Sequence, residues 1–242
     1  MKFIKKHWMS IRKRLRLAIS ERFFLKRVGN TLFLLDIRNK VDRHVDVSNG
    51  YETKQVKYLT QLLKNSGCGV FCDIGAHWGY YSILLAKCPG FERVEFYAFE
   101  PDKVNRYQLY ANLFINKLEQ VIKVYTCGLS DYDGEASFQS YDESNRGKSR
   151  LSSQGDSSVT VNRLDGLLSF KDEVIGFKID VEGHEVGVVA GMQELLKNNK
   201  CILQIESFAD KLSSLSLQME NLGYKKIHSI KNDHYFSNIG NI

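Results

Sequence analysis

The sequence lacks any run of about 18 uncharged apolar residues, the length that a membrane-spanning helix requires. Its N-terminus also lacks the continuous apolar segment and the cleavage site of a secretory signal. The five cysteines are odd in number, and no two of them have the CxxC spacing typical of zinc and redox sites. These absences predict a cytoplasmic protein without a bound metal, whose cysteines are mostly buried as small apolar residues.

Most of the chain has no excess of positive charge, because the basic residues are concentrated at the N-terminus. The formal net charge is +6, but residues 1–30 alone hold ten Lys or Arg against one acid, Glu21. The rest of the chain has 24 basic and 27 acidic residues. A body so close to neutrality argues against a nucleic-acid-binding domain, and we expect no nucleic-acid partner.

The basic N-terminal arm, residues 1–30, has a helical apolar pattern. Apolar residues recur at helical spacing: Ile4, Trp8, Ile11, Leu15 and Ile19. Residues 2–27 are therefore predicted to form a basic amphipathic helix. One interpretation is a helix on an anionic membrane surface, which would make the protein peripheral at the inner membrane surface. The other is a helix that packs on its own domain or on the second subunit of a homodimer.

Beyond the arm, strands and helices alternate in a predicted domain of residues 31–242. The expected strands are 31–37, 70–75, 94–100, 122–130, 134–141, 158–164, 176–183 and 201–207, and the expected helices are 51–64, 79–87, 102–117, 185–198 and 209–222. Residues 142–157 read as a long mobile loop, and residues 224–230 and 233–238 as a closing hairpin. The pattern predicts an α/β fold: a Rossmann-like, doubly wound, mostly parallel sheet with helices on both faces and an antiparallel C-terminal hairpin.

A glycine-containing turn follows the predicted strand at 70–75. The segment DIGAHWGYYS, residues 73–82, opens the next helix. Gly75 suits a tight turn, and Gly79 suits the close approach of a ligand or of the helix to the backbone. Asp73 could accept a hydrogen bond from a ligand amine, and backbone N–H groups of the turn could face a carboxylate. The alternative is a tight turn that holds no ligand.

Glu100 ends the following strand, 21 residues after Gly79. A carboxylate at this position can accept hydrogen bonds from both hydroxyls of a ribose, so Asp73 and Glu100 together predict a bound nucleoside. The third glycine of the GxGxxG dinucleotide fingerprint is missing, which argues against a Rossmann dehydrogenase. The alternative for Glu100 is a solvated carboxylate at the start of a helix.

A second group of charged residues lies in FKIDVEGHE, residues 177–185. In an extended segment Lys178, Asp180 and Glu182 share one face, and the two acids should lie at the carboxyl end of a strand. With His184 nearby, the group could supply a general base or bind a metal. The alternative is a structural Lys178–Asp180 pair followed by a helix-capping Glu185.

These segments together resemble class I methyltransferases and, within that class, the FkbM family. The matching stretches lie within residues 68–207 and are FCDIGAHWGYYSILLA, YAFEPD, CGLSDYDGEASF, VNRLDGLL, FKIDVEGHEVGVVAGMQELL and LQIES. The most specific strings are DIGAxxGYYS and DVEGxE. One position departs from the family: His77 stands where the family usually has Asn, although His can also donate or accept a hydrogen bond.

The resemblance implies an O-methyltransferase that uses S-adenosylmethionine and acts on hydroxyls of sugars, polyketides or other secondary metabolites. It implies cofactor contacts from Asp73, Gly75, Ala76, His77, Gly79, Glu100, Gly128 and Asp131. It also implies a reaction side lined by Asp180, Glu182 and Glu185. An alcohol is a weak nucleophile at neutral pH, so a base near its oxygen should help, and the candidates are Asp180, Glu182 and His184.

The expected acceptor is therefore a hydroxyl of a small molecule or a glycan. Only Pro89 and Pro101 are present. The chain thus lacks the Asn/Asp-Pro-Pro-aromatic loop typical of base amino-group methylation, and it lacks the Pro-Cys nucleophile typical of pyrimidine-carbon methylation. Two alternatives stay open: a ribose-hydroxyl RNA methyltransferase with the arm on RNA, and a non-catalytic methyltransferase-like domain that binds a partner.

Overall fold

A seven-stranded sheet forms the centre of the structure, a computed structural model that describes residues 21–48, 50–142 and 144–240. From edge to edge its strands are β12 (Lys225–Ile230), β13 (Asp233–Ser237), β11 (Lys200–Glu206), β10 (Val174–Ile179), β3 (Val70–Ile74), β4 (Glu95–Phe99) and β5 (Ile122–Tyr125). The strands from β11 to β5 are parallel, and β13 is antiparallel to β11. The strand order reverses between the neighbours β3 and β10, and ligands of open α/β sheets bind at such a point.

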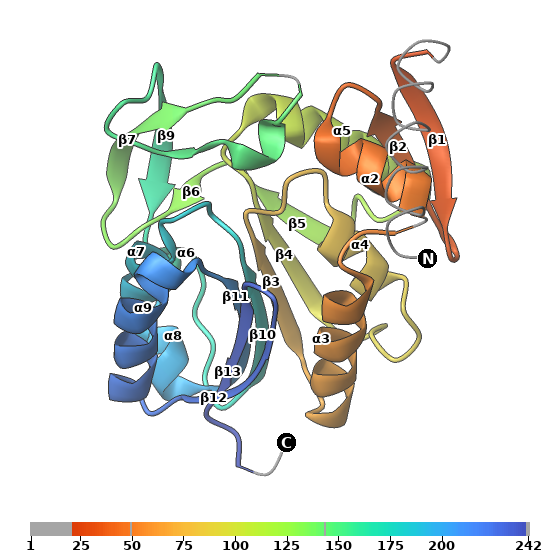
Figure 1. The fold of residues 1–242 in the computed structure, drawn as a ribbon. Helices are drawn as coiled ribbons and strands as arrows, with labels where there is room; N and C mark the ends of the chain where they lie inside the picture. Colours follow the sequence, from red (N-terminus) through yellow and green to blue (C-terminus); the bar gives the residue numbers. More distant parts are fainter. Residues whose placement is uncertain (1–20, 49, 143, 241–242) are drawn as a thin grey trace, which may run out of the picture.

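Two hydrophobic cores lie on opposite faces of this sheet. Successive strand residues enter different cores, as Phe71 and Cys72 do, because side chains alternate along a strand. One core includes α3 (Thr53–Asn65), α4 (Tyr80–Ala86) and α5 (Lys103–Asn116). The other includes α6 (Leu164–Leu167), α7 (Glu185–Ala190), α8 (Gln193–Asn198) and α9 (Ala209–Asn221). Figure 1 shows helices on both sides of the sheet, which confirms the predicted fold class and its antiparallel hairpin.

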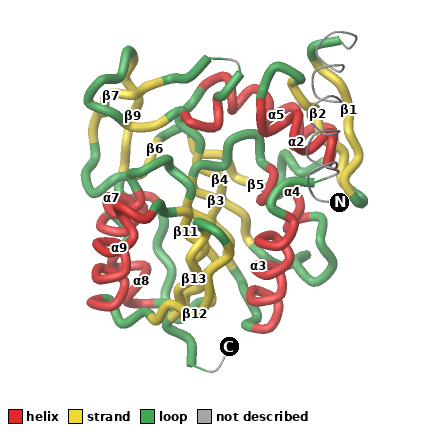
Figure 2. Tube along the Cα trace, in the orientation of Figure 1, coloured by secondary structure: helices red, strands yellow, loops and turns green. Residues whose placement is uncertain are grey.

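A second, smaller sheet lies beyond the carboxyl ends of the central strands. Its order is β6 (Gly128–Leu129), β9 (Ser157–Asn162), β7 (Gly134–Gln139) and β8 (Arg150–Leu151). Figure 2 shows β6, β7 and β9 above the upper ends of β3 and β4. A 3-10 turn, η1 (Arg146–Lys148), joins β7 to β8. We call residues 145–151 the roof segment, because they extend over this end of the central sheet.

The backbone of β2 (Thr31–Asp36) finds hydrogen-bond partners on both of its edges. On one edge β1 (Phe23–Val28) pairs with it in antiparallel register. On the other edge, amide side chains of α5 take the place of a strand. Gln108 donates to the Leu34 carbonyl at 2.9 Å, Asn112 accepts from the Leu34 N–H at 2.7 Å, and Asn116 bonds to both backbone groups of Leu32. The four-residue spacing of these amides aligns them on one helix face.

The predicted helix at residues 2–27 is wrong in its last part. Phe23–Val28 form strand β1, in which exposed and half-buried residues alternate with a period of two, as expected for a strand with one covered face. Its pairing with β2 overrides the helical periodicity of the preceding residues. Residues 2–20 lie outside the described part of the chain. In that described part, no helix is long and apolar enough to cross a bilayer.

Three further segments differ from their predictions. The helix expected at 185–198 breaks into α7 and α8 because Gly191 packs on the backbone carbonyl of Ser130, where any Cβ would overlap. The strand expected at 122–130 divides between the two sheets as β5 and β6. The segment expected as a loop, 142–157, contains η1 and β8. Helix α2 (Lys40–Ser48) was not predicted, although Asn39 caps it by accepting from the Val41 N–H at 2.8 Å.

The hydrogen bonds of Gln108, Asn112 and Asn116 with β2, which we call the amide ladder, can be tested at Asn112. It is fully buried, accepts from Leu34 and donates to the Trp78 carbonyl at 3.0 Å. We expect Asn112→Ala to lower the free energy of unfolding by about 1–3 kcal/mol for each orphaned backbone group. Urea denaturation measures the effect, with Asn198→Ala at the exposed end of α8 as the control. Equal stabilities of the two variants would contradict the role of the ladder.

Candidate functional site

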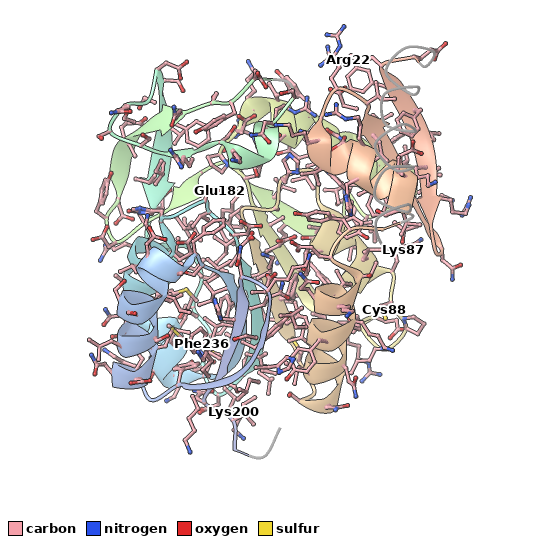
Figure 3. All side chains as sticks on the ribbon, in the orientation of Figure 1. Arg22, Lys87, Cys88, Glu182, Lys200 and Phe236 are labelled. Carbon is pink, nitrogen blue, oxygen red and sulfur yellow. The ribbon has the colours of Figure 1, made fainter. Side chains whose placement is uncertain are left out.

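The carboxyl ends of β3, β4 and β10 open into a pocket of about 270 Å³. Its walls come from the turn after β3, the ends of β4, β10 and β11, and β6 with the residue before it. The turn before α3 and the roof segment complete the lining. Figure 3 shows Glu182 at this end of the sheet, below the roof segment. The pocket therefore lies at the reversal of strand order, as the topology predicts.

The two glycines of the turn after β3 have different tasks. Both have positive φ angles, +80° for Gly75 and +86° for Gly79. A Cβ on Gly75 would overlap the backbone carbonyl of Asp180, so this glycine lets the ends of β3 and β10 meet. A Cβ on Gly79 would lie 2.5 Å from Leu109 in α5. Gly79 therefore permits helix packing and does not line the pocket.

Two carboxylates on the β3–β4 side are anchored by backbone donors. Asp73 accepts from the N–H and the hydroxyl of Ser82, at 3.0 and 2.6 Å, at the start of α4. Glu100 accepts from the N–H groups of His77 and Asp102, at 2.7 and 2.8 Å. Burial raises the pKa of Asp73 and raises the pKa of Glu100 to about 7. Each carboxylate keeps lone pairs for a ligand donor, because every oxygen can accept twice.

Buried polar atoms without partners occur in the same wall. Within the described residues, His77 Nε2, Trp78 Nε1 and Asn105 Oδ1 form no hydrogen bond, and all three residues line the pocket. Burial lowers the pKa of His77 to about 3, so its imidazole is neutral at pH 7. Because buried polar atoms almost always have partners, this wall is suited to a polar ligand.

On the opposite side, a buried lysine lies among acids. Lys178 Nζ is 3.3 Å from Asp180 Oδ2 and 3.6 Å from Asp233 Oδ1. The charge of Asp180, together with burial, raises the pKa of Glu206 to about 9. Glu206 therefore holds a proton at neutral pH beside the lysine-paired Asp180. The two carboxyl groups therefore lie close enough for the charge of Asp180 to favour the protonated form of Glu206.

A chain of hydrogen bonds extends this cluster to the turn before α3. Tyr81 donates to Glu52 at 2.8 Å, and Gln204 donates to the Tyr81 oxygen at 2.9 Å and to Asp233 at 2.7 Å. Burial raises the pKa of Glu52. These hydrogen bonds hold acids from different elements close to one another. Among the described residues, no three His, Cys, Asp or Glu side chains are arranged to hold a metal ion.

Of the two glutamates that follow β10, Glu182 lines the pocket and Glu185 does not. Glu182 has a left-handed φ of +52° and lines the pocket, and burial followed by the charge of Asp180 raises its pKa to about 7. Glu185 is buried outside the pocket lining, where it accepts from the Gly183 N–H at 2.7 Å. Of the structural alternative, the Lys178–Asp180 pair is present, whereas Glu185 is the first residue of α7 and accepts from the turn before it. The pair coexists with the pocket.

His184 lines the pocket but already has a partner. Its Nε2 lies 2.9 Å from the Ser130 hydroxyl, and its ring packs against Gly187. Burial lowers the pKa of His184, which keeps the ring neutral near pH 7. The neighbouring Asp131 is exposed, accepts from Ser130 at 3.0 Å and lies outside the pocket lining.

The roof segment is held by one buried arginine. Arg146 donates to Asp36 at 3.1 Å and to Gln108 at 2.8 Å. This ion pair is almost fully buried, so removal of either partner would leave an uncompensated charge. Lys148 and Arg150 follow Arg146 in the segment, line the pocket and oppose the rise in the pKa of Glu182. A segment of loop-like composition thereby becomes a fixed wall.

The structure brings together nine of the twelve predicted site residues. The pocket lining includes Asp73, Gly75, Ala76, His77, Glu100, Gly128, Asp180, Glu182 and His184. Gly79, Asp131 and Glu185 lie outside it.

Sequence reasoning missed several residues of the pocket, of which Glu52, Asn105 and Glu206 carry polar groups into it. Glu206 ends a parallel strand as Glu100 does, so the same argument would have found it. Glu52 has no local signal, because it reaches the pocket from the turn before α3.

The fold and this pocket define the α/β architecture of class I methyltransferases. The chain matches the Methyltransferase FkbM domain over residues 73–226, more than half of its length. It belongs to the FkbM methyltransferase family, which confirms the resemblance found in the sequence. A comparison with curated proteins gave no match.

Solved structures with a similar fold have low sequence identity to this chain. Methyltransferase FkbM from Methylobacillus flagellatus KT aligns with a TM-score of 0.51 and 15% identity over 81% of this chain and 52% of that one. The chain thus spans about half the length of that protein. M. jannaschii TYW2 in complex with AdoMet aligns at 0.47 and 14%, over 90% and 84%. Precorrin-6y C5,15-methyltransferase from Geobacter metallireducens GS-15 aligns at 0.46 and 13%, over 76% and 86%. At these identities the likeness concerns the fold alone.

The contact between Gly75 and Asp180 can be tested with a matched glycine. Gly67 also has a positive φ, +66°, but a Cβ there would meet nothing within 4 Å. Gly67→Ala should therefore cost only the left-handed strain, about 1–2 kcal/mol. Gly75→Ala should cost a further 1–3 kcal/mol, about the usual effect of overpacking. Chemical denaturation measures both, and equal losses would show that the strand ends do not depend on this contact.

Proposed function

We propose that this protein is an S-adenosylmethionine-dependent O-methyltransferase that acts on a hydroxyl of a small molecule or a glycan. The observation that carries the proposal is one pocket with two kinds of carboxyl groups. Asp73 and Glu100 line one side with anchored acceptors. Asp180 and Glu206 line the other as a pair that can exchange a proton. Membership of a methyltransferase family supports methyl transfer as the reaction.

The residues on the β3–β4 side fit the chemistry of the cofactor. S-adenosylmethionine presents ribose hydroxyls, a polar base, an amino group and a carboxylate. Glu100 can accept from the ribose hydroxyls and Asp73 from the amino group. The unpartnered atoms of His77 and Asn105 offer further polar contacts. These atoms are buried and unpaired without a ligand, which supports a polar occupant.

On the reaction side, the residues align the acceptor oxygen, limit the access of water and remove a proton. When bound, the cofactor supplies a methyl group that its positive sulfonium has already activated. The walls of the pocket hold the acceptor oxygen in line with that group, and the roof segment limits the access of water. Asp180 takes the hydroxyl proton, with Lys178 fixing its position and the protonated Glu206 beside it. Glu182 is the next candidate base, whereas His184 is occupied by Ser130.

Cofactor affinity should depend on the ionisation of Glu100. Ribose hydroxyls donate to the carboxylate, so with a pKa of about 7 the affinity should rise with pH, by up to about tenfold per unit, and level off above pH 7. The raised pKa also means that ionisation costs stability in the free protein as pH rises from 4.5 to about 7. Calorimetry with S-adenosylhomocysteine measures the binding, and Glu100→Gln should remove the pH dependence.

The same titration tests the cofactor itself. Glu100→Ala should weaken binding by about 1–3 kcal/mol, the usual effect of losing a charged hydrogen-bond partner. Unchanged affinity in both Glu100→Ala and Asp73→Ala would rule out this cofactor assignment.

The proton-accepting pair can be tested without changing its shape. Asp180→Asn keeps volume and removes a charge, and Glu206→Gln keeps volume and removes a titratable proton. Each should lower turnover by about 10²-fold or more, while cofactor affinity stays nearly constant. Transfer of labelled methyl groups to fractionated metabolites and glycans is the assay. Asp131→Asn, at an exposed site outside the pocket, is the control.

Full turnover in both pair variants would transfer the role to Glu182. Activity lost to a chelator and restored by magnesium would identify the acids as metal ligands instead.

A further inference from the structure

Helix α5 has its polar and apolar residues on unusual sides. The three amides that bond to β2 are buried, although amides usually face water. Its outward positions are instead apolar, with exposed fractions of 47% for Val104, 61% for Tyr107, 45% for Tyr110 and 71% for Phe114. Their spacing places one of them on each successive turn of the same outward side. A helix on a fully solvated surface would be expected to show polar residues there.

Exposed apolar side chains also occur on β1, which pairs with the strand that α5 flanks. Phe23 and Leu25 are 45% and 56% exposed and lie two residues apart, so they share one face of the β1–β2 pair. Figure 1 shows β1, β2 and α5 grouped at one corner of the molecule. Of the twelve large exposed apolar side chains among the described residues, seven belong to β1, α5 or Val121 just beyond α5. We call the area of Phe23, Leu25, Val104, Tyr107, Tyr110 and Phe114 the α5–β1 surface, and such a concentration marks an interaction site.

The charges around this surface are mostly of one sign. Strand β1 and helix α5 contain two basic residues each and no acidic residue. Lys103 lies 5.8 Å from the centre of the Tyr107 ring, and the exposed Lys117 and Arg27 lie at the end of α5 and in β1. Residues 1–20, which lead directly to β1, have seven Lys or Arg and no acid. The exposed acids next to these segments in sequence are Glu21 and Glu119.

We propose that the α5–β1 surface docks the domain on an anionic phospholipid bilayer. Tyr107, Tyr110 and Phe114 enter the interfacial region, and Lys103 and Lys117 contact the acidic headgroups. A second copy of the chain would also cover the apolar side chains. A symmetric contact, however, would bring each basic rim against its own copy, and this like-charge repulsion favours the bilayer as the partner.

Vesicle sedimentation with the full-length protein tests the proposal. The protein should bind phosphatidylcholine vesicles that contain phosphatidylglycerol and should ignore vesicles of phosphatidylcholine alone, and added salt should weaken the binding. The double variant Tyr107→Ser/Phe114→Ser should lower the partition coefficient by about tenfold or more, because its apolar contribution is lost. The control is Tyr132→Ser/Leu217→Ser, which changes side chains with 45% and 60% exposure elsewhere on the molecule. Unchanged melting curves verify that both variants fold.

Three results would overturn the proposal. One is the absence of binding to the anionic vesicles. Another is full binding by Tyr107→Ser/Phe114→Ser, since residues 1–20 would then suffice. The third is a wild-type dimer in sedimentation equilibrium that this variant abolishes, which would assign the surface to a second copy. None of these readouts involves methyl transfer, so they are independent of the proposed function.

Discussion

The contact between Gly75 and the backbone carbonyl of Asp180 is the constraint from which the geometry of the pocket follows. It lets the ends of β3 and β10 meet where the strand order reverses. The parallel register then sets Asp73 beside Lys178, one residue pair before the strands end. Side chains from the first and the second half of the domain thereby line one cavity. Any side chain at position 75 would separate the two halves at the point where their polar groups converge.

The buried charges depend on that convergence. A lysine with almost no exposed surface is tolerated only with compensating carboxylates, and Lys178 has Asp180 just beyond the end of its own strand and Asp233 on β13. Burial and the charge of Asp180 raise the pKa of the neighbouring Glu182, and the charge of Asp180 and burial raise the pKa of Glu206. Crowding of acids therefore keeps some of them protonated near pH 7. This is the condition under which carboxyl groups can both accept and return a proton.

Sequence reasoning succeeded where local pattern decides the structure. The buried run Val70–Ile74 and the capped helix after Glu100 are local features, and the carboxyl ends of parallel strands converge by topology, so Asp73, Glu100 and Asp180 could be placed together. Sequence reasoning failed where a partner that is distant in the sequence determines the local structure. Strand β1 exists because β2 pairs with it, and the roof segment is ordered because Arg146 finds an aspartate 110 residues away. Residue-type periodicity carries no information on such contacts.

The oxygen that anchors Arg146 has a second partner. Asp36 Oδ2 accepts from Arg146 at 3.1 Å and from Arg22 at 3.0 Å, so one atom joins the roof of the pocket to the start of the described chain. Both cations compensate the charge of this buried carboxylate. Asp36 is therefore the common partner of Arg22, which precedes β1, and of Arg146 in the pocket wall. Loss of this one buried carboxylate would therefore release both the start of the described chain and the roof of the pocket.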